Sequence, residues 1–147
     1  MIRPAVEEDI PELVAMIREL ADYENLTEEV SITEDDLARV LFGPEAMAYD
    51  WVMEEAGGAV VGHALWYRTF STFLGKTGIW LEDLYIRPEY RRHGYAGQLL
   101  TKLRQETDGR VEWDVLEWNV PAMDFYQRLG ARPMAGWTRY RWTLPQP

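Results

Sequence analysis

The stretch from Gly78 to Leu103 places an apolar strand, a basic glycine-containing turn and an amphipathic helix directly one after another. β-Branched and aromatic residues dominate Ile79 to Ile86, and Pro88 ends the run because proline cannot donate to a sheet ladder. After the turn, four apolar residues recur at the i, i+3, i+4 and i+7 spacing of one helix face: Ala96, Leu99, Leu100 and Leu103. The segment from Arg91 to Gly97 is therefore expected where a strand meets a helix N-terminus.

A helix N-terminus is a ready anion site, because its first backbone N–H groups lack internal partners and its dipole end is positive. Small residues at Gly94, Ala96 and Gly97 let an anion approach the backbone closely. Three arginines add positive charge nearby: Arg87, Arg91 and Arg92. The turn lacks the GxxxxGK[ST] spacing of a P-loop and has only part of the GxGxxG dinucleotide fingerprint. We expect it to hold the phosphate or pyrophosphate of another nucleotide.

The segment Arg91-Arg92-His93-Gly94-Tyr95-Ala96 resembles the Q/R-x-x-G-x-G/A signature of the GNAT N-acetyltransferases, which hold acetyl-CoA by its pyrophosphate. Other segments match the family in order: Ile2 to Ala5, Leu81 to Ile86, Glu117 to Asn119, Phe125-Tyr126 and Gly130-Ala131. Residues 18–24, 81–83 and 117–119 look most like the diamine and polyamine branch, which includes enzymes acting on thialysine. The resemblance implies these coenzyme-binding residues: Leu84, Tyr85, Ile86, Arg91, Arg92, His93, Gly94, Tyr95, Ala96, Gly97, Asn119 and Tyr126.

The order of strands and helices predicts a mixed α/β layer fold in one domain, residues 1–147. The GNAT resemblance implies a mostly antiparallel central sheet, helices on both faces, and two splayed central strands that hold the pantetheine arm between them. The predicted strands are Ile2 to Ala5, Ala48 to Glu55, Ala59 to Phe70, Thr77 to Ile86, Arg110 to Trp118, and a last one or hairpin at Trp137 to Leu144. The predicted helices end near Tyr23-Glu24, Gly43-Pro44, Asp108-Gly109 and Gly130; Thr33 caps the second and Asn119 the last.

Charge is distributed unevenly along the chain. Residues 1–60 hold 16 acidic and 3 basic side chains, a balance of −13, whereas residues 61–147 hold 9 acidic and 12 basic ones, a balance of +3; together they give the net charge of −10. Strong acidity argues against a nucleic-acid partner, whose phosphates need neutralising, and favours a cationic substrate.

Cysteine is absent, so we expect no disulfide, no thiolate zinc cluster and no cysteine nucleophile. The isolated histidines His63 and His93 lack the spacing of a metal site, and no metal is expected. The first nine residues lack the apolar core of a signal peptide and no run approaches membrane-spanning length, so we expect a cytoplasmic protein without a membrane partner.

Acetyl transfer to an amine requires a neutral amine, a stabilised oxyanion and a proton for the departing thiolate. At neutral pH only roughly one alkylamine in a thousand is unprotonated. Glu82 and Asp83 lie late in the strand before the turn. Because neighbouring strand residues point to opposite faces, only one is expected to face the cleft. We favour Glu82 as general base, acting directly or through a water; the other interpretation is a pair of surface carboxylates.

The resemblance implies that Tyr126 protonates the coenzyme thiolate; on residue type alone, a core aromatic is the alternative. Backbone N–H groups of Leu84 to Ile86 are expected to meet the oxyanion. Asn119 is expected to cap its helix, and the resemblance adds a contact with pantetheine. His93 is expected to contribute its backbone N–H.

Tyr23 and Glu24 match the branch's substrate-contacting pair, and Glu24 with Glu82 would bracket a molecule with two positive ends; the alternative is a solvated helix terminus. Glu112 is a further candidate for lining this cleft. Residues 132–137 lack the acidic residues that polyamine-acetylating relatives carry, which favours a smaller diamine or a thialysine-like amine.

The leading hypothesis is an acetyl-CoA-dependent N-acetyltransferase for a primary amine of a small cationic substrate. The alternatives are a non-catalytic acyl-CoA-binding sensor and an acetyltransferase for protein amines. A homodimer is expected because relatives form one and because the chain has seven tryptophans, residues typical of interfaces.

Overall fold

The computed structural model describes residues 1–145. The chain divides into two compact units, Met1–Asp114 and Val115–Pro147. The first contains the β-sheet and the helices packed on it, and the second contains helix α4 and the C-terminal segment.

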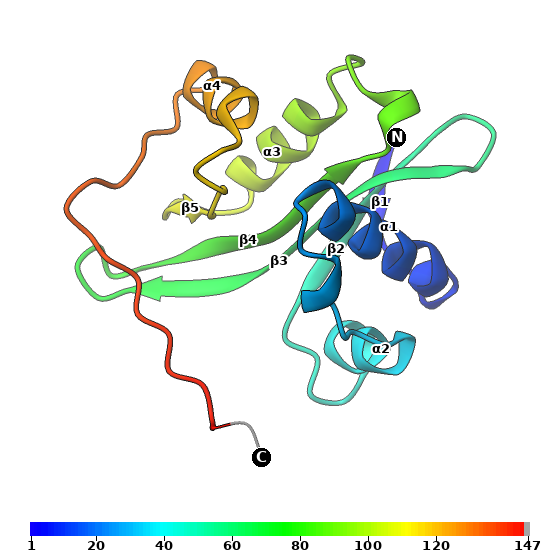
Figure 1. Cartoon of the computed structure of the whole chain (residues 1–147), viewed down its shortest axis with the longest axis horizontal. Coiled ribbons are helices and arrows are strands. Elements are labelled where there is room, and N and C mark those ends of the chain that lie inside the picture. The colour runs from blue at the N-terminus through cyan, green and yellow to red at the C-terminus, as the bar shows by residue number, and fades with distance from the viewer. Residues whose placement is uncertain (146–147) are drawn as a thin grey trace. The chain divides into compact units, whose positions relative to one another are not determined.

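The first unit is built on a five-stranded sheet in the order β1-β2-β3-β4-β5 (Figure 1). Its strands are β1 (Ile2–Pro4), β2 (Tyr49–Glu54), β3 (Val60–Ser71), β4 (Lys76–Ile86) and β5 (Val111–Glu112). Strands β1 to β4 pair antiparallel, whereas β4 and β5 pair in parallel. This confirms the predicted mixed, mostly antiparallel sheet.

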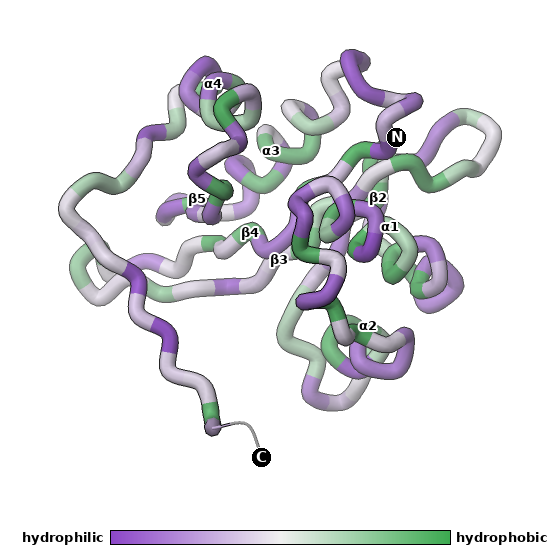
Figure 2. Tube along the Cα trace, viewed as in Figure 1, coloured by the Kyte–Doolittle hydropathy of each residue, from purple (hydrophilic) through white to green (hydrophobic). Residues whose placement is uncertain are grey.

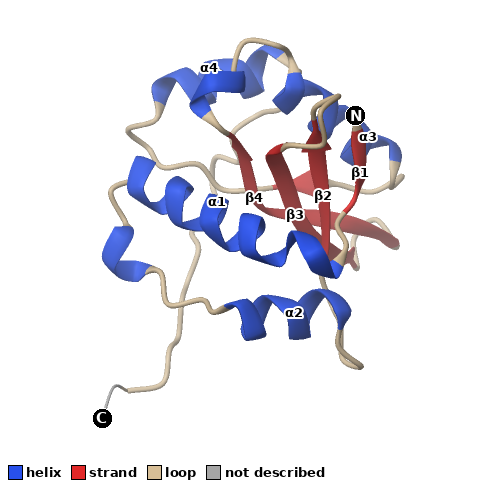
Figure 3. Ribbon diagram, turned by 90° about the vertical axis from the view of Figure 1, so that its right-hand side faces the viewer, coloured by secondary structure: helices blue, strands red, loops and turns tan. Residues whose placement is uncertain are grey.

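Helices cover both faces of this sheet (Figure 3). The α-helices of the first unit are α1 (Ile10–Tyr23), α2 (Glu34–Phe42) and α3 (Tyr95–Gln105), and the short 3-10 helices are η1 (Glu7–Asp9), η2 (Thr27–Glu29) and η3 (Pro88–Tyr90). Leu13 of α1 and Leu37 of α2 share a buried cluster with Val52 of β2. Trp51 precedes Val52 in the same strand. The ammonium of Lys102, from α3, lies over the Trp51 ring, 4.8 Å from its centroid. Because consecutive strand residues point to opposite faces, α1 and α2 lie on one face and α3 on the other.

Thr33 caps the N-terminus of α2, which confirms the prediction. The Thr33 hydroxyl accepts the Asp36 backbone N–H at 3.1 Å, and the Asp36 carboxylate accepts the Thr33 N–H at 3.0 Å. This capping box satisfies two otherwise unpaired donors. Both α1 and α2 carry hydrophobic and hydrophilic residues along their length (Figure 2), as expected of helices with one buried face.

Strands β4 and β5 are paired over two residues only. The pairs are Ile79 with Val111 and Trp80 with Glu112. Strand β4 continues to Ile86, so the two strands part after Trp80, as the predicted splay requires. The predicted strand from Arg110 to Trp118 is too long. Strand β5 ends at Glu112, because its hydrogen-bonded pairing with β4 ends there.

Two further boundaries differ from the prediction. Helix α3 ends at Gln105 instead of near Asp108, because the Thr107 hydroxyl donates to the Thr77 carbonyl at 2.7 Å and accepts the Gly109 N–H at 3.0 Å. These bonds turn the chain toward β5. The predicted strand from Trp137 to Leu144 is absent, and the large apolar side chains of this segment are exposed.

The second unit begins at Val115 and contains α4 (Val120–Arg128). The Asn119 side-chain oxygen accepts the Ala122 N–H at 3.4 Å, which confirms the predicted cap. Gly130 has φ 100° just after the helix, a conformation that favours glycine.

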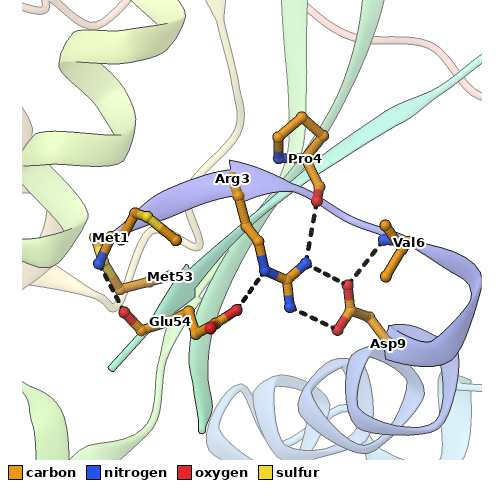
Figure 4. A network of polar contacts seen from close by, with 7 residues as sticks. All are labelled: Met1, Arg3, Pro4, Val6, Asp9, Met53 and Glu54. Atoms are coloured by element: carbon orange, nitrogen blue, oxygen red, sulfur yellow. Dashed lines mark hydrogen bonds and ion pairs between the residues drawn. The ribbon is translucent and has the colours of Figure 1, made fainter. Parts of the chain in front are cut away.

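A network around Arg3 joins the N-terminal strand to β2 and to the start of α1 (Figure 4). The guanidinium contacts both carboxylate oxygens of Asp9, at 2.7 and 3.0 Å, and its Nε donates to Glu54. Asp9 also accepts the Val6 N–H at 2.8 Å. The Arg3 guanidinium lowers the pKa of Asp9 below its ordinary value of 3.8.

Replacing Asp9 with Asn removes this ion pair, and we expect the free energy of unfolding at pH 7 to fall by about 2 kcal/mol. A carboxylate with a lowered folded-state pKa stabilises the fold above its unfolded pKa, and this stability is lost as pH falls below about 3.8. Urea unfolding at several pH values should therefore show the difference between wild type and D9N shrinking below that pH. Exposed Glu8 supplies the control E8Q, expected to change stability by less than about 0.5 kcal/mol; equal effects of D9N and E8Q would contradict the assignment.

Candidate active site

The turn before α3 has the backbone geometry of an anion site. Arg92 and Gly94 adopt left-handed conformations, with φ 67° and 78°. Gly94 is the N-cap of α3 and has no side chain to cap it. Within residues 1–145, the N–H groups from Arg92 to Gly97 meet no protein acceptor. A Cβ added at Gly97 would have no atom within 4 Å, so the space in front of these donors is open.

Side chains of the turn are held by protein contacts. His93 Nδ1 donates to the Tyr90 carbonyl at 2.9 Å, and its ring stacks on Tyr95 with centroids 5.5 Å apart. The Tyr95 hydroxyl donates to Glu55 at 2.7 Å, and this bond raises the pKa of Tyr95. The turn therefore presents mainly its backbone donors to a guest.

The three arginines near the turn have different surroundings. Arg87 forms ion pairs with Glu12 at 2.7 Å and Glu19 at 3.0 Å, so its charge is neutralised by α1. Arg91 donates through Nε to the Ile86 carbonyl at 2.8 Å. Its guanidinium lies 5.4 Å from the ring centroid of Tyr23 and 5.5 Å from that of Tyr85. Arg92 is exposed.

A β-bulge interrupts β4 at Glu82. Leu65 of β3 pairs with Asp83, and the next residue, Trp66, pairs with Leu81, so Glu82 is an extra residue without a partner in the ladder. The alternation that predicts opposite faces for the two carboxylates does not apply across such an insertion.

Both carboxylates lie on the α1 side of the sheet. Asp83 pairs with Leu65, and Trp80 pairs with Tyr67; both of these partners pack in the core beneath α1. The Trp80 ring N–H donates to the Glu82 carboxylate at 2.9 Å, which brings Glu82 to the same side. The two carboxylates therefore do not point to opposite faces as simple alternation predicts.

Acidic side chains from two elements gather on this side. Burial raises the pKa of Asp83, and the charges of Glu82 and Asp50 raise it further, while His63 lowers it. Burial also raises the pKa of Glu24, which follows α1, and the Asp83 carboxylate adds to the effect. Within the described residues, no arginine or lysine forms an ion pair with Glu24, Glu82 or Asp83. This acidic cluster, Glu24, Glu82 and Asp83, is suited to a cation and to proton transfer.

Glu82 and Asp83 differ in ways that the sequence did not indicate. Glu82, which we favoured as the base, is exposed, whereas Asp83 is half-buried. Asp83 is also the carboxylate whose pKa is raised toward the range of a general base.

The other predicted substrate-contacting residues lie on neighbouring elements. Glu112 lies in β5 opposite Trp80, and Tyr23 lies beside Glu24 with its ring against Arg91.

A buried pair behind the cluster was missed by sequence reasoning. His63 Nδ1 lies 2.9 and 3.1 Å from the two carboxylate oxygens of Asp50, and both side chains are fully buried. The available signal was an aspartate and a histidine within otherwise apolar strands.

Leu84, Tyr85 and Ile86 form the last part of β4. They pair with β3 on one edge, and within Met1–Asp114 the other edge has no strand partner beyond Trp80. Backbone groups on this edge are therefore free of sheet hydrogen bonds. In the second unit, Tyr126 is half-buried on α4, with its ring centroid 5.6 Å from that of Phe125.

Among residues 1–145, no three histidine, aspartate or glutamate side chains gather as a metal ion would require. Every helix in the same range is too short or too polar to cross a bilayer.

Comparison with known proteins relates this arrangement to one family. The model of the Acetyltransferase (GNAT) family matches residues 9–131. Thialysine N-epsilon-acetyltransferase from Bos taurus is 36% identical, covering 96% of this chain and 91% of that protein. L-ornithine N5-acetyltransferase NATA1 from Arabidopsis thaliana is 28% identical over 97% of this chain and 83% of its own. A crystal structure titled a probable acetyltransferase superposes with a TM-score of 0.81, at 21% identity, over 100% of this chain and 99% of that one.

The family match spans strands β2 to β5, the turn and α4, and the bovine relative is similar over nearly the whole chain. The chain therefore belongs to the GNAT family and is an acetyltransferase.

Proposed function

We propose that this enzyme transfers the acetyl group of acetyl-CoA to a primary amine of a small cationic substrate, such as a diamine, polyamine, thialysine or lysine-like amine. The observation that carries the proposal is the acidic cluster of Glu24, Glu82 and Asp83, with which no arginine or lysine of the described residues forms an ion pair. Glu82 and Asp83 lie on the strand that leads directly to the open donors of Arg92 to Gly97. GNAT acetyltransferases use acetyl-CoA, and the relatives named for thialysine and ornithine support an amine acceptor.

The residues of the turn fit a diphosphate. Six consecutive N–H groups, which meet no acceptor among the described residues, would bind the pyrophosphate of the coenzyme, and the positive end of α3 adds to the attraction. The unpaired edge of β4 at Leu84 to Ile86 would donate N–H groups to the pantetheine arm and to the developing oxyanion.

The acidic cluster would bind and deprotonate the amine. A carboxylate with a raised pKa is a better proton acceptor than an ordinary aspartate, so Asp83 joins Glu82 as a candidate general base. Glu24, with Tyr23 and Glu112, would hold the second positive end of the substrate. Tyr126 would give its hydroxyl proton to the departing thiolate, an assignment that rests on the family resemblance.

The proposal includes a homodimer and a cytoplasmic location. Trp137, Tyr140, Trp142 and Leu144 are each at least 77% exposed. Apolar surface of this kind is commonly covered by a partner, which supports a second copy of the chain as its occupant.

Gly97→Ala should weaken coenzyme A binding at least about tenfold, since the added methyl group would stand between the N–H donors and the pyrophosphate. The fold should be unaffected or slightly more stable, because the Cβ meets no protein atom and alanine favours a helix. Isothermal titration calorimetry measures the affinity. Gly57→Ala, at another position with open space, is the matched control and should bind like wild type. Wild-type affinity in G97A would exclude the turn as the pyrophosphate site.

Asp83→Asn and Glu82→Gln should each reduce kcat/KM for the amine, by about 10²-fold or more for whichever carboxylate is the base, with the larger effect expected at Asp83. Since the base acts when ionised, wild-type kcat/KM should fall as pH drops through the raised pKa of Asp83. A thiol-release assay with diamines, lysine-like amino acids and aminoglycosides measures both.

Exposed Glu89 supplies the matched control for this assay, E89Q, which should behave like wild type. If wild type binds the coenzyme but acetylates none of these amines, the acceptor is not a small amine. A peptide panel then tests protein amines.

Tyr126→Phe should lower kcat on the order of a hundredfold with little change in fold, because the change removes the hydroxyl and keeps the ring. Steady-state kinetics at saturating amine tests this. Tyr140→Phe, at a 92% exposed position, is the control. Undiminished turnover in Y126F would remove this residue from the mechanism.

A further inference from the structure

The Asp50–His63 pair leaves one ring nitrogen without a protein partner. His63 Nδ1 lies within hydrogen-bonding distance of both carboxylate oxygens of Asp50, at 2.9 and 3.1 Å. His63 has no exposed surface, yet Nε2 meets no hydrogen-bond partner within the described residues. Leaving a buried polar atom unpaired is unfavourable by about 1–3 kcal/mol.

The strand register places His63 between two carboxylates. On the α1 side of the sheet, Leu65 pairs with Asp50 on one edge and with Asp83 on the other. His63 lies two residues from Leu65 on the same central strand and the same face, so Asp50 and Asp83 are its diagonal neighbours on either side. Since Nδ1 is directed to Asp50 on β2, the opposite edge of the imidazole, with Nε2, is directed toward β4.

We propose that His63 is a positioning residue for Asp83. Asp50 fixes the protonated ring, an imidazolium, through Nδ1–H, and Nε2–H is directed toward the Asp83 carboxylate through one water, which holds this carboxylate ionised and oriented for the amine. The inference rests on the proposed function, in which Asp83 belongs to the amine-binding acidic cluster.

The surrounding charges agree with this arrangement. His63 faces Asp50, Asp83 and Arg87, and the two carboxylates raise the pKa of His63 against the effect of burial, which is the largest single influence and lowers it. Asp50 also faces Asp9, a further carboxylate.

Around Asp83, the neighbours that act on its ionisation are His63, Glu82 and Asp50, and Glu24 faces it from the end of α1. His63 is the only one of the named influences that favours the ionised form of Asp83. Without it, burial and neighbouring carboxylates would act on Asp83 unopposed.

NMR titration tests the coupling without any assay of activity. The chain has two histidines, so the His63 ring signals are identified by removing exposed His93 with H93Q. In that background Asp83→Asn should lower the pKa of His63, because a facing negative charge is lost, whereas Glu89→Gln should leave it unchanged. An identical His63 titration with and without the Asp83 carboxylate would overturn the proposal.

Kinetics tests the consequence for the amine. His63→Gln should raise the pKa of Asp83 and so shift the acid limb of the kcat/KM profile to higher pH. For a shift of about one pKa unit, the variant should lose about tenfold more activity at a pH on this limb than on the alkaline plateau. Leu37→Ala, a buried change in α2, is the control for lost stability and should keep the wild-type pH profile.

A wild-type profile in folded H63Q would overturn the positioning role, even if kcat falls. Failure of the proposed function gives a different result, because wild type would then acetylate no amine at any pH. The NMR titration would still decide whether His63 and Asp83 interact.

Discussion

Strand β4 is hydrogen-bonded on both edges only as far as Trp80, and the chemistry of the protein depends on this early end of pairing. A fully paired central strand has no backbone donor to offer a ligand. Once β5 diverges, the edge from Leu81 to Ile86 has donors without sheet partners, a few residues before the open N–H groups of the turn. One strand thus supplies backbone donors along its length and a helix N-terminus at its end.

The bulge at Glu82 adds the acidic component to the same strand. In a regular ladder Glu82 and Asp83 would lie on opposite sides of the sheet, and one would meet the α3 side. The extra residue brings both to the α1 side, where Glu24 also lies. Burial and the charges of neighbouring carboxylates raise the pKa values of Asp83 and Glu24, and this is the environment in which a carboxylate serves as a general base.

Local signals in the sequence predicted the turn and its flanking elements correctly, because proline, glycine and the 3.6-residue period act within a few residues. The bulge could not be predicted in this way, since the register is a property of two strands. The same reason explains the overlong β5 and the missing strand at Trp137 to Leu144, where alternation is present but no neighbouring strand pairs. Asp50 and His63, separated by 13 residues, meet only through the β2–β3 register.

The distribution of cations explains how the α1 side tolerates so many carboxylates. Arg87 forms ion pairs with Glu12 and Glu19, and Arg3 forms ion pairs with Asp9 and Glu54. Asp50, which no arginine reaches, has His63. These ion pairs do not include the acidic cluster, and Asp83 and Glu24, whose ionised forms burial and repulsion destabilise, gain most from a cation that arrives from solution. In the proposed function, selectivity for a positively charged amine would follow from this arrangement, because no arginine or lysine of the described residues forms an ion pair with Glu24, Glu82 or Asp83.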